Sequence, residues 1–268
     1  MIIASAHGVA GELSATFRPQ EMGGAEVTAR PPLELRGPFF EGDQWPSYYL
    51  RNVTSGVFAC DSYDVTLRTE HGVDVTVTSP SATKVYAMPE CTAKSRVLLE
   101  ALPVSRLAYL PQPTILQAGS DLCQETALVV HEGGQVIFCD VVTLGRLASG
   151  ERLAFRRFQS RLRVRRSCDD ALLYRECFTL EPDEIRYCIE AAIGGYGVMI
   201  TIVATGVAES PASLVGLLPA GPECWAGVDA LPGGGGFIVR ALAPNTTWAT
   251  RLLDQCASWS GFAAGFAP

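Results

Sequence analysis

The chain is dominated by short stretches in which polar and apolar residues alternate. Asp64–Thr69 and Asp74–Thr78 alternate polar and apolar residues, and Glu70–Gly72 between them is a turn candidate. A period of two places successive side chains on opposite faces, which predicts half-buried β-strands. The same reading predicts further strands at Arg96–Glu100, Arg106–Leu110, Thr126–Val130, Gln135–Val142, Leu172–Thr179 and Phe237–Arg240.

Turns such as His131–Gly134 separate these short strands. Such spacing is typical of stacked hairpins, a sandwich or a β-solenoid. No clean repeat period appears, so the sequence alone leaves these three arrangements open.

Helices are predicted in the C-terminal third. Ser210–Leu218 begins with a serine cap and a proline at the first helical position, and Asn245–Cys256 begins with an asparagine cap. Pro182–Gly194 is ambiguous between helix and strand. From Trp248 onward, apolar residues recur at helical spacing and form a stripe. The stripe fits burial in the core better than contact with a partner protein, and both interpretations stay open. Its members are Trp248, Leu252, Cys256 and Trp259.

The chain has 268 residues, of which 48% are hydrophobic and 18% charged, with a formal net charge of -7. This composition supports a sizeable core. We expect one domain over residues 1–268, with a β body at about 1–205 and a helix-containing part at about 206–268. The acidic balance argues against nucleic acid as the main partner.

The nine cysteines form no CxxC pair, and the three histidines lie far apart. A zinc ribbon or redox motif is therefore not expected, and buried reduced thiols are. The first residues have neither a basic region nor a sustained apolar run, and Gly197–Ala204 is too short to span a bilayer. We expect a cytoplasmic protein without membrane contact.

Arginines alternate with apolar residues at Arg161, Arg163 and Arg165. On a strand the three guanidinium groups would share one face. That face could be solvated or salt-bridged, or could dock an acidic protein patch. A nucleic-acid-binding module is a weaker alternative, because no aromatic residues are interleaved to stack on bases.

No sequence motif for a nucleophile or general base is present, and we assign no catalytic residue. Carboxylates recur at Asp61, Asp64, Glu125, Asp140, Glu151 and Glu176, but their spacing brings no two together. A β-helical carbohydrate-active enzyme that uses Asp/Glu pairs remains the alternative from another class.

Several segments, taken in order, resemble the UreD (UreH) family of urease accessory proteins. They are Gly11–Leu13, Arg36–Phe40, Thr78–Tyr86, Tyr109–Ile115, Leu144–Glu151 and Leu172–Glu176. The resemblance covers about residues 11–180 well and the last third in general layout. Its motif residues are Thr83, Lys84, Tyr86, Pro111, Gln112, Gly145, Arg146 and Gly150.

Two positions depart from the family pattern. Thr54–Asp61 stands where the family has a glycine-rich segment, and it keeps the aspartate but few of the glycines. Glycine permits backbone angles that alanine or cysteine resists, so this turn is expected to differ. Pro113 replaces a glutamate of the family motif.

The resemblance implies a non-enzymatic protein with a β-helix-like stack of sheets and about two C-terminal helices. It implies UreF-like and UreG-like partners, with GTP only on the UreG-like GTPase, and delivery of nickel to urease apoprotein. No tightly bound cofactor is expected, only transient nickel(II). As a hypothesis within that resemblance, Asp61, Asp140, Glu151 and Glu176 line or support the nickel path.

The same resemblance suggests two docking regions. Trp248, Leu252 and Trp259 would bind the UreF-like partner, and the arginine strand or another sheet face would meet urease. Deleting the residues after about 245 would then abolish the first contact and leave the β body folded.

Overall fold

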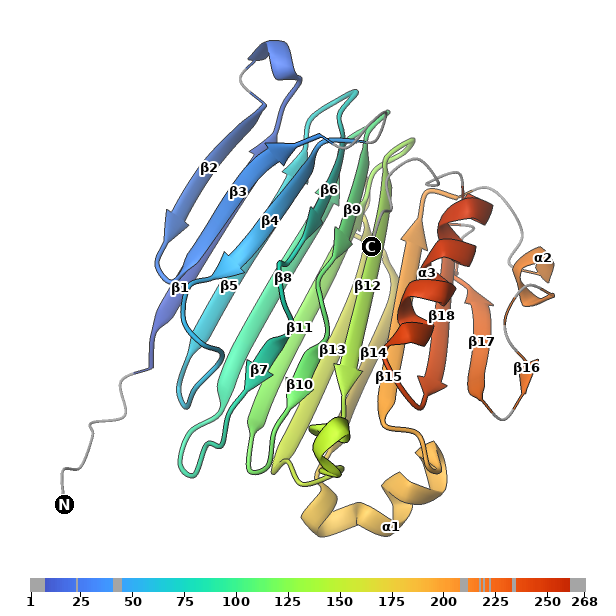
Figure 1. Cartoon of the computed structure of the whole chain (residues 1–268). Helices are drawn as coiled ribbons and strands as arrows, with labels where there is room; N and C mark the ends of the chain where they lie inside the picture. Colours follow the sequence, from blue (N-terminus) through green and yellow to red (C-terminus); the bar gives the residue numbers. More distant parts are fainter. Residues whose placement is uncertain are drawn as a thin grey trace.

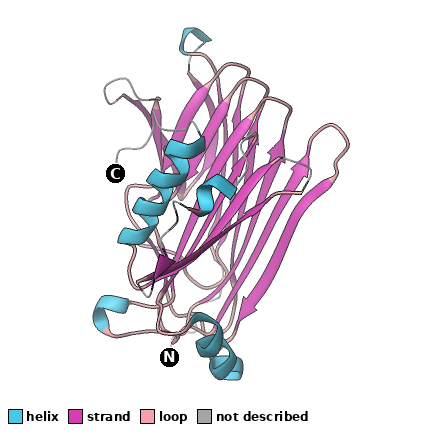
Figure 2. Ribbon diagram, turned by 90° about the vertical axis from the view of Figure 1, so that its right-hand side faces the viewer, coloured by secondary structure: helices cyan, strands magenta, loops and turns pink. Residues whose placement is uncertain are grey.

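The computed structural model describes residues 8–22, 24–40, 45–207, 212–216, 218, 220–221, 223–232 and 235–260. Two β-sheets face each other across the main hydrophobic core (Figures 1 and 2). Sheet A has the strand order β14-β13-β11-β8-β5-β1-β2. Its strands are β1 (Ala10–Phe17), β2 (Ala25–Arg30), β5 (Ser62–Thr69), β8 (Ala93–Ala101), β11 (Asp121–Val130), β13 (Arg157–Arg166) and β14 (Leu172–Leu180).

Sheet B has the order β16-β17-β18-β15-β12-β9-β6-β4-β3, and the short strands β7 and β10 pair with each other beside it. The first half of this sheet comprises β3 (Leu33–Phe39), β4 (Ser47–Asn52), β6 (Asp74–Thr78), β7 (Thr83–Val85), β9 (Arg106–Leu110) and β10 (Thr114–Leu116). The second half comprises β12 (Gln135–Thr143), β15 (Val198–Thr205), β16 (Ala220–Gly221), β17 (Cys224–Ala230) and β18 (Gly236–Ala243).

The chain winds from one sheet to the other as a β-solenoid. Strands β1, β5, β8, β11 and β13 are all parallel neighbours, as are β4, β6, β9 and β12. The turns at Glu70–Gly72 and His131–Gly134 therefore cross between the sheets and do not close hairpins. The mainly β, β-helix-like fold is confirmed, and the solenoid is the arrangement found among the three left open.

The coils differ in length. Ala10, Ser62, Lys94, Cys123 and Gln159 lie side by side on successive strands of sheet A, although unequal stretches of chain separate them. This inequality explains why the sequence shows no repeat period. The inner faces still stack in register, as in the fully buried row Ala15, Leu67, Leu99, Leu128 and Val164.

The helices lie at the periphery of the sheets. The ambiguous segment forms α1 (Pro182–Ile193), so a helix falls within the stretch expected to be the β body. The second predicted helix is α3 (Thr247–Ser260), where the Asn245 side chain accepts a hydrogen bond from the Thr247 backbone N–H at 3.1 Å. α3 covers the outer face of sheet B (Figure 1). Of the first predicted helix, α2 (Ala212–Val215) is described, whereas Ser210 and Pro211 lie outside the described residues.

Two short 3-10 helices complete the elements, η1 (Gln20–Met22) and η2 (Leu147–Ser149). No helix in the described part combines the length and the apolar composition needed to cross a membrane.

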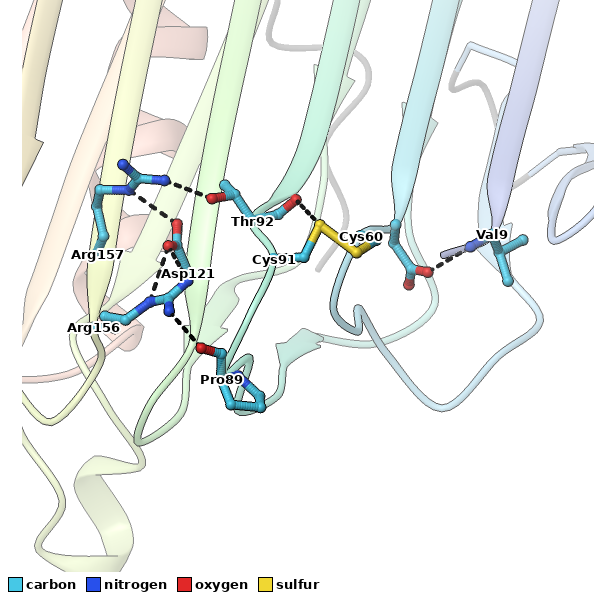
Figure 3. Close-up of a disulfide and its surroundings, with 9 residues drawn as sticks. Val9, Cys60, Pro89, Cys91, Thr92, Asp121, Arg156 and Arg157 are labelled. Carbon is cyan, nitrogen blue, oxygen red and sulfur yellow. Dashed lines mark hydrogen bonds and ion pairs between the residues drawn. A yellow bond between two sulfur atoms is a disulfide. The ribbon is translucent and has the colours of Figure 1, made fainter. Parts of the chain in front are cut away.

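The expectation of buried reduced thiols is confirmed for Cys139, Cys224 and Cys256 and is wrong for other cysteines. Cys60 and Cys91 form a disulfide, which joins the turns before β5 and β8 (Figure 3). Cys168, Cys177 and Cys188 are exposed. The disulfide was missed because sequence spacing does not show that the corners of successive coils lie against each other.

Candidate functional site

A cavity of about 190 Å³ lies between the two sheets. Thr54–Gly56 and Ser79–Lys84, which include exposed residues, form its outer end. Gln124, Phe138 and Asp140 line it on the inner side. The space is large enough for several water molecules, and its lining is rich in hydroxyl and amide groups.

The segments that carry the family resemblance meet at this cavity. In the parallel pair β7–β10 the Thr83 backbone N–H donates to the Pro113 carbonyl oxygen at 2.9 Å. Thr83, Lys84 and Pro111 line the cavity. At its rim the Gln112 backbone N–H donates to the Ser79 hydroxyl at 2.8 Å, and the Tyr86 ring stacks on Phe58 with centroids 4.9 Å apart.

The loop Thr54–Asp61 closes the outer end of the cavity. Gly56 has a φ of +157°, and a Cβ there would lie 2.4 Å from the Lys84 carbonyl oxygen, so the close approach requires glycine. Cys60 has a φ of +65°, a conformation unusual for a side-chain-bearing residue. The turn therefore uses a glycine-like conformation at a cysteine, which the disulfide to Cys91 fixes in place.

Asp61 anchors this turn and does not line the cavity. Its buried carboxylate accepts hydrogen bonds from the backbone N–H groups of Val9 and Phe58, both at 2.8 Å, and from the Tyr63 hydroxyl at 2.7 Å. Figure 3 shows the bond to Val9 beside the disulfide. These partners occupy the carboxylate oxygens that a metal ion would need.

Asp140 points from β12 into the cavity. Its carboxylate accepts a 2.6 Å hydrogen bond from the Gln124 amide, which also donates to the Ser160 hydroxyl at 3.3 Å. The residue is half-buried and lines the cavity. Burial raises the pKa of Asp140 to about 6, against the opposing effects of the Gln124 bond and the Arg240 charge.

Glu176 is neutralised by an arginine. The Arg240 guanidinium from β18 pairs with its carboxylate, and the Tyr174 hydroxyl donates to it at 2.8 Å. Glu176 and Arg240 thus link sheet A to sheet B, and Glu176 does not line the cavity.

Glu151 closes the turn around η2. Its carboxylate accepts from the Arg146 guanidinium at 2.6 Å and from the Ala118 backbone N–H at 3.0 Å. These bonds, led by the one from Arg146, lower the pKa of Glu151. Gly145 and Gly150 have φ values of +139° and +72°, so this motif builds a tight turn away from the cavity.

The arginines of β13 share the outer face of sheet A, as predicted. Arg161 pairs with Glu125 from β11, and Arg165 pairs with Asp170 at 2.7 Å. Two of the three charges are thus neutralised within the chain.

The stripe on α3 packs largely within the chain. Leu252 is fully buried against sheet B, and Trp248 is half-buried with the Arg251 guanidinium over its ring. The side chain of Trp259 lies outside the described part. A deletion after residue 245 would remove Leu252 and Cys256 from the core, so we no longer expect the β body to remain unaffected by it.

The structure brings one of the four predicted path residues, Asp140, to the cavity. Among the described residues, no three His, Cys, Asp or Glu side chains come together as a metal site. An ion in the cavity would meet the Asp140 carboxylate and neutral oxygen donors, with the exposed Lys84 at the outer end. The described lining also lacks the facing pair of carboxylates that glycoside hydrolysis needs, because Glu125 pairs with Arg161 on the outer face.

Gln124 is a site residue that the sequence analysis missed. It occupies an inward position of β11, where Leu122, Thr126 and Leu128 on either side are buried. A long polar side chain at a core position of an alternating strand was the signal that could have revealed it.

Comparison with known proteins places these observations in a family. Residues 9–265 match the family model described as UreD urease accessory protein. A protein from Haloarcula marismortui named urease accessory protein UreD is 32% identical over 72% of this chain and 65% of its own length. For the protein of the same name from Pseudomonas aeruginosa the identity is 30%, over 81% of this chain and 76% of the relative.

A third relative is urease accessory protein UreD 2 from Streptomyces griseus, which is 35% identical over 56% of this chain and 52% of its own length. The aligned part thus spans less than two thirds of the Haloarcula and Streptomyces proteins. All three names describe an accessory protein and none describes an enzyme.

Proposed function

Because this chain belongs to the UreD family of urease accessory proteins, we propose that it is a scaffold through which nickel reaches urease apoprotein. Asp140 in the cavity between the sheets is the observation that carries the proposal. A buried carboxylate with a raised pKa is costly to keep, and such groups cluster at functional sites.

A path for an ion should bind it weakly enough to release it. Nickel(II) accepts oxygen ligands, and one carboxylate among neutral donors gives a weak site. The same requirement of entry and departure applies to ion channels. The Gln124 amide and the hydroxyls of the lining supply polar contacts without the fixed charge that would trap the cation.

The partners belong to the same proposal. A UreF-like protein would bind this chain and bring a UreG-like GTPase, which alone would hold GTP, in the cytoplasm. Since Leu252 is buried, α3 would meet a partner through its exposed residues, among them Thr250, Arg251 and Asp254.

Replacement of Asp140 by Asn tests the nickel path. The chain would be co-expressed with urease and the other accessory proteins, and the nickel content of purified urease would be measured. We expect a loss of tenfold or more, because Asn removes the Asp140 carboxylate from the cavity and keeps an acceptor for Gln124, while the Glu125 carboxylate is paired with Arg161.

Glu151→Gln is the matched control, since it removes one carboxylate outside the cavity. Undiminished nickel in urease matured with Asp140→Asn, with the accessory complex intact, would contradict the proposal. An equal loss in both variants would do so as well.

A further inference from the structure

A shallow groove of about 200 Å³ runs across the outer face of sheet A. Its floor is the row Thr66, Leu98 and Ala127, which lie in register on β5, β8 and β11. These short or apolar side chains stand on a face where the adjacent row carries long charged ones. The difference in side-chain length creates the groove.

One wall of the groove carries ion pairs that are already satisfied. Asp64 pairs with Arg96 at 2.7 Å, and Glu125 pairs with Arg161. These four side chains form a neighbouring row across the same strands. The wall is therefore polar but close to neutral, and it adds no net attraction for a charged ligand.

The end of the groove is different. Arg163 continues the floor row on β13, and Arg175 lies directly opposite it on β14. Neither guanidinium forms an ion pair or hydrogen bond with another described residue. Like charges directly opposite on paired strands are destabilising. In a chain with a net charge of -7, two adjacent unpaired arginines create a local site for an anion.

We propose that this groove binds an extended segment of a protein partner whose carboxylate lies between Arg163 and Arg175 and whose small apolar side chains pack on Thr66, Leu98 and Ala127. Arginine forks match the geometry of a carboxylate and hold it through paired N–H donors. The backbone groups of sheet A are used in its own ladders, so side chains make the recognition. The cavity between the sheets takes no part in it.

The dimensions fit a short peptide. Strands lie about 4.8 Å apart, so the three spacings from β5 to β13 cover about 14 Å. An extended chain rises about 3.3 Å per residue, and about five residues span that distance. The partner segment is thus a run of small apolar residues that ends in Asp or Glu.

Binding of labelled peptides to the whole chain tests the inference. The probes are fluorescein-labelled Ala-Val-Ala-Val-Glu-Glu and its reverse Glu-Glu-Val-Ala-Val-Ala, each with a blocked C-terminus, and versions with Gln in place of Glu. Fluorescence anisotropy is read at low and high salt. We expect one acidic probe to bind, the matching Gln probe to bind at least tenfold more weakly, and salt to weaken the acidic probe.

The double variant Arg163→Gln/Arg175→Gln should lose at least tenfold in affinity for the acidic probe. Lys94→Gln is the control, because it removes one exposed cation from the same face outside the groove. Circular dichroism verifies that each variant is folded.

Three results would overturn the inference. The wild-type chain could leave both acidic probes free at millimolar concentration. The double variant could bind as tightly as the wild type. Inorganic phosphate could displace the acidic probe at the affinity of the peptide itself, which would assign the arginines to a simple anion. None of these measurements uses nickel or urease. A negative result here is therefore distinguishable from a failure of the proposed nickel path.

Discussion

At the scale of single residues, the Asp140 carboxylate lowers the free energy of unfolding at neutral pH and is the group proposed to contact nickel. A carboxylate in this enclosed position is harder to ionise than in the unfolded chain, since its pKa rises from 3.8 to about 6. The folded state therefore binds more protons than the unfolded state between these two values. By linkage, the free energy of unfolding falls as the pH rises through this window and stays lower above it.

Asp140→Asn should accordingly be more stable than the wild type at pH 7.5, by up to about 3 kcal/mol for a pKa difference of about two units. The gain should shrink toward zero near pH 4, where the wild-type carboxyl is protonated. Urea denaturation at several pH values measures both. A variant less stable than wild type at pH 7.5 would show that the attraction between Asp140 and Arg240 outweighs the cost of burial.

At the scale of elements, the disulfide ties together two corners of neighbouring coils. Cys60 and Cys91 are 31 residues apart, and cross-linking them restricts the unfolded chain. The double variant Cys60→Ser/Cys91→Ser should lose about 2–4 kcal/mol of unfolding free energy under oxidising conditions. Denaturation with and without a dithiol measures this. The two proteins should become similar once the reductant is present, and a difference that persists there would be traced to the serines themselves.

The strands could be predicted from the sequence because their alternation is local. In Asp64–Arg68 the inward residues Val65 and Leu67 are apolar and the outward ones are polar, so half-burial was visible from the sequence. Their neighbours could not be predicted, because pairing of β5 with β1 and β8 depends on residues many positions away. The helix α1 was ambiguous because its apolar residues do not share one face: Ile189 and Ile193 are buried, whereas Ile185 and Tyr187 are exposed.

The candidate site was predicted in part. Asp140 was named from its residue type and the family resemblance. The other three predicted residues do not line the cavity, because the carboxylates of Asp61, Glu151 and Glu176 are bonded elsewhere. Such contacts join distant parts of the chain; the pair Glu176–Arg240, for example, joins the two sheets. Nothing in the local sequence around Glu176 indicates that contact.

At the scale of the whole molecule, the pair Glu176–Arg240 connects the two sheets beside the cavity. Glu176→Gln would leave the half-buried Arg240 without its counter-ion. A buried pair broken in this way costs about 3–5 kcal/mol, and partial exposure reduces the figure here to about 1–2 kcal/mol. Thermal unfolding measures the loss, and Arg30→Gln, at the exposed ion pair with Glu12, is the comparison. An equal effect of the two changes would argue against a special role for the inter-sheet pair.

The unequal lengths of the coils show how proteins with this fold can diverge from one another by insertion. Each coil is held by hydrogen bonds to the coils beside it along its strands, and its corners connect one sheet to the other. An insertion at a corner therefore changes the corner of one coil and leaves the strand register of the adjoining coils intact. Related proteins can consequently acquire new corner segments, one coil at a time, while the two sheets stay unchanged.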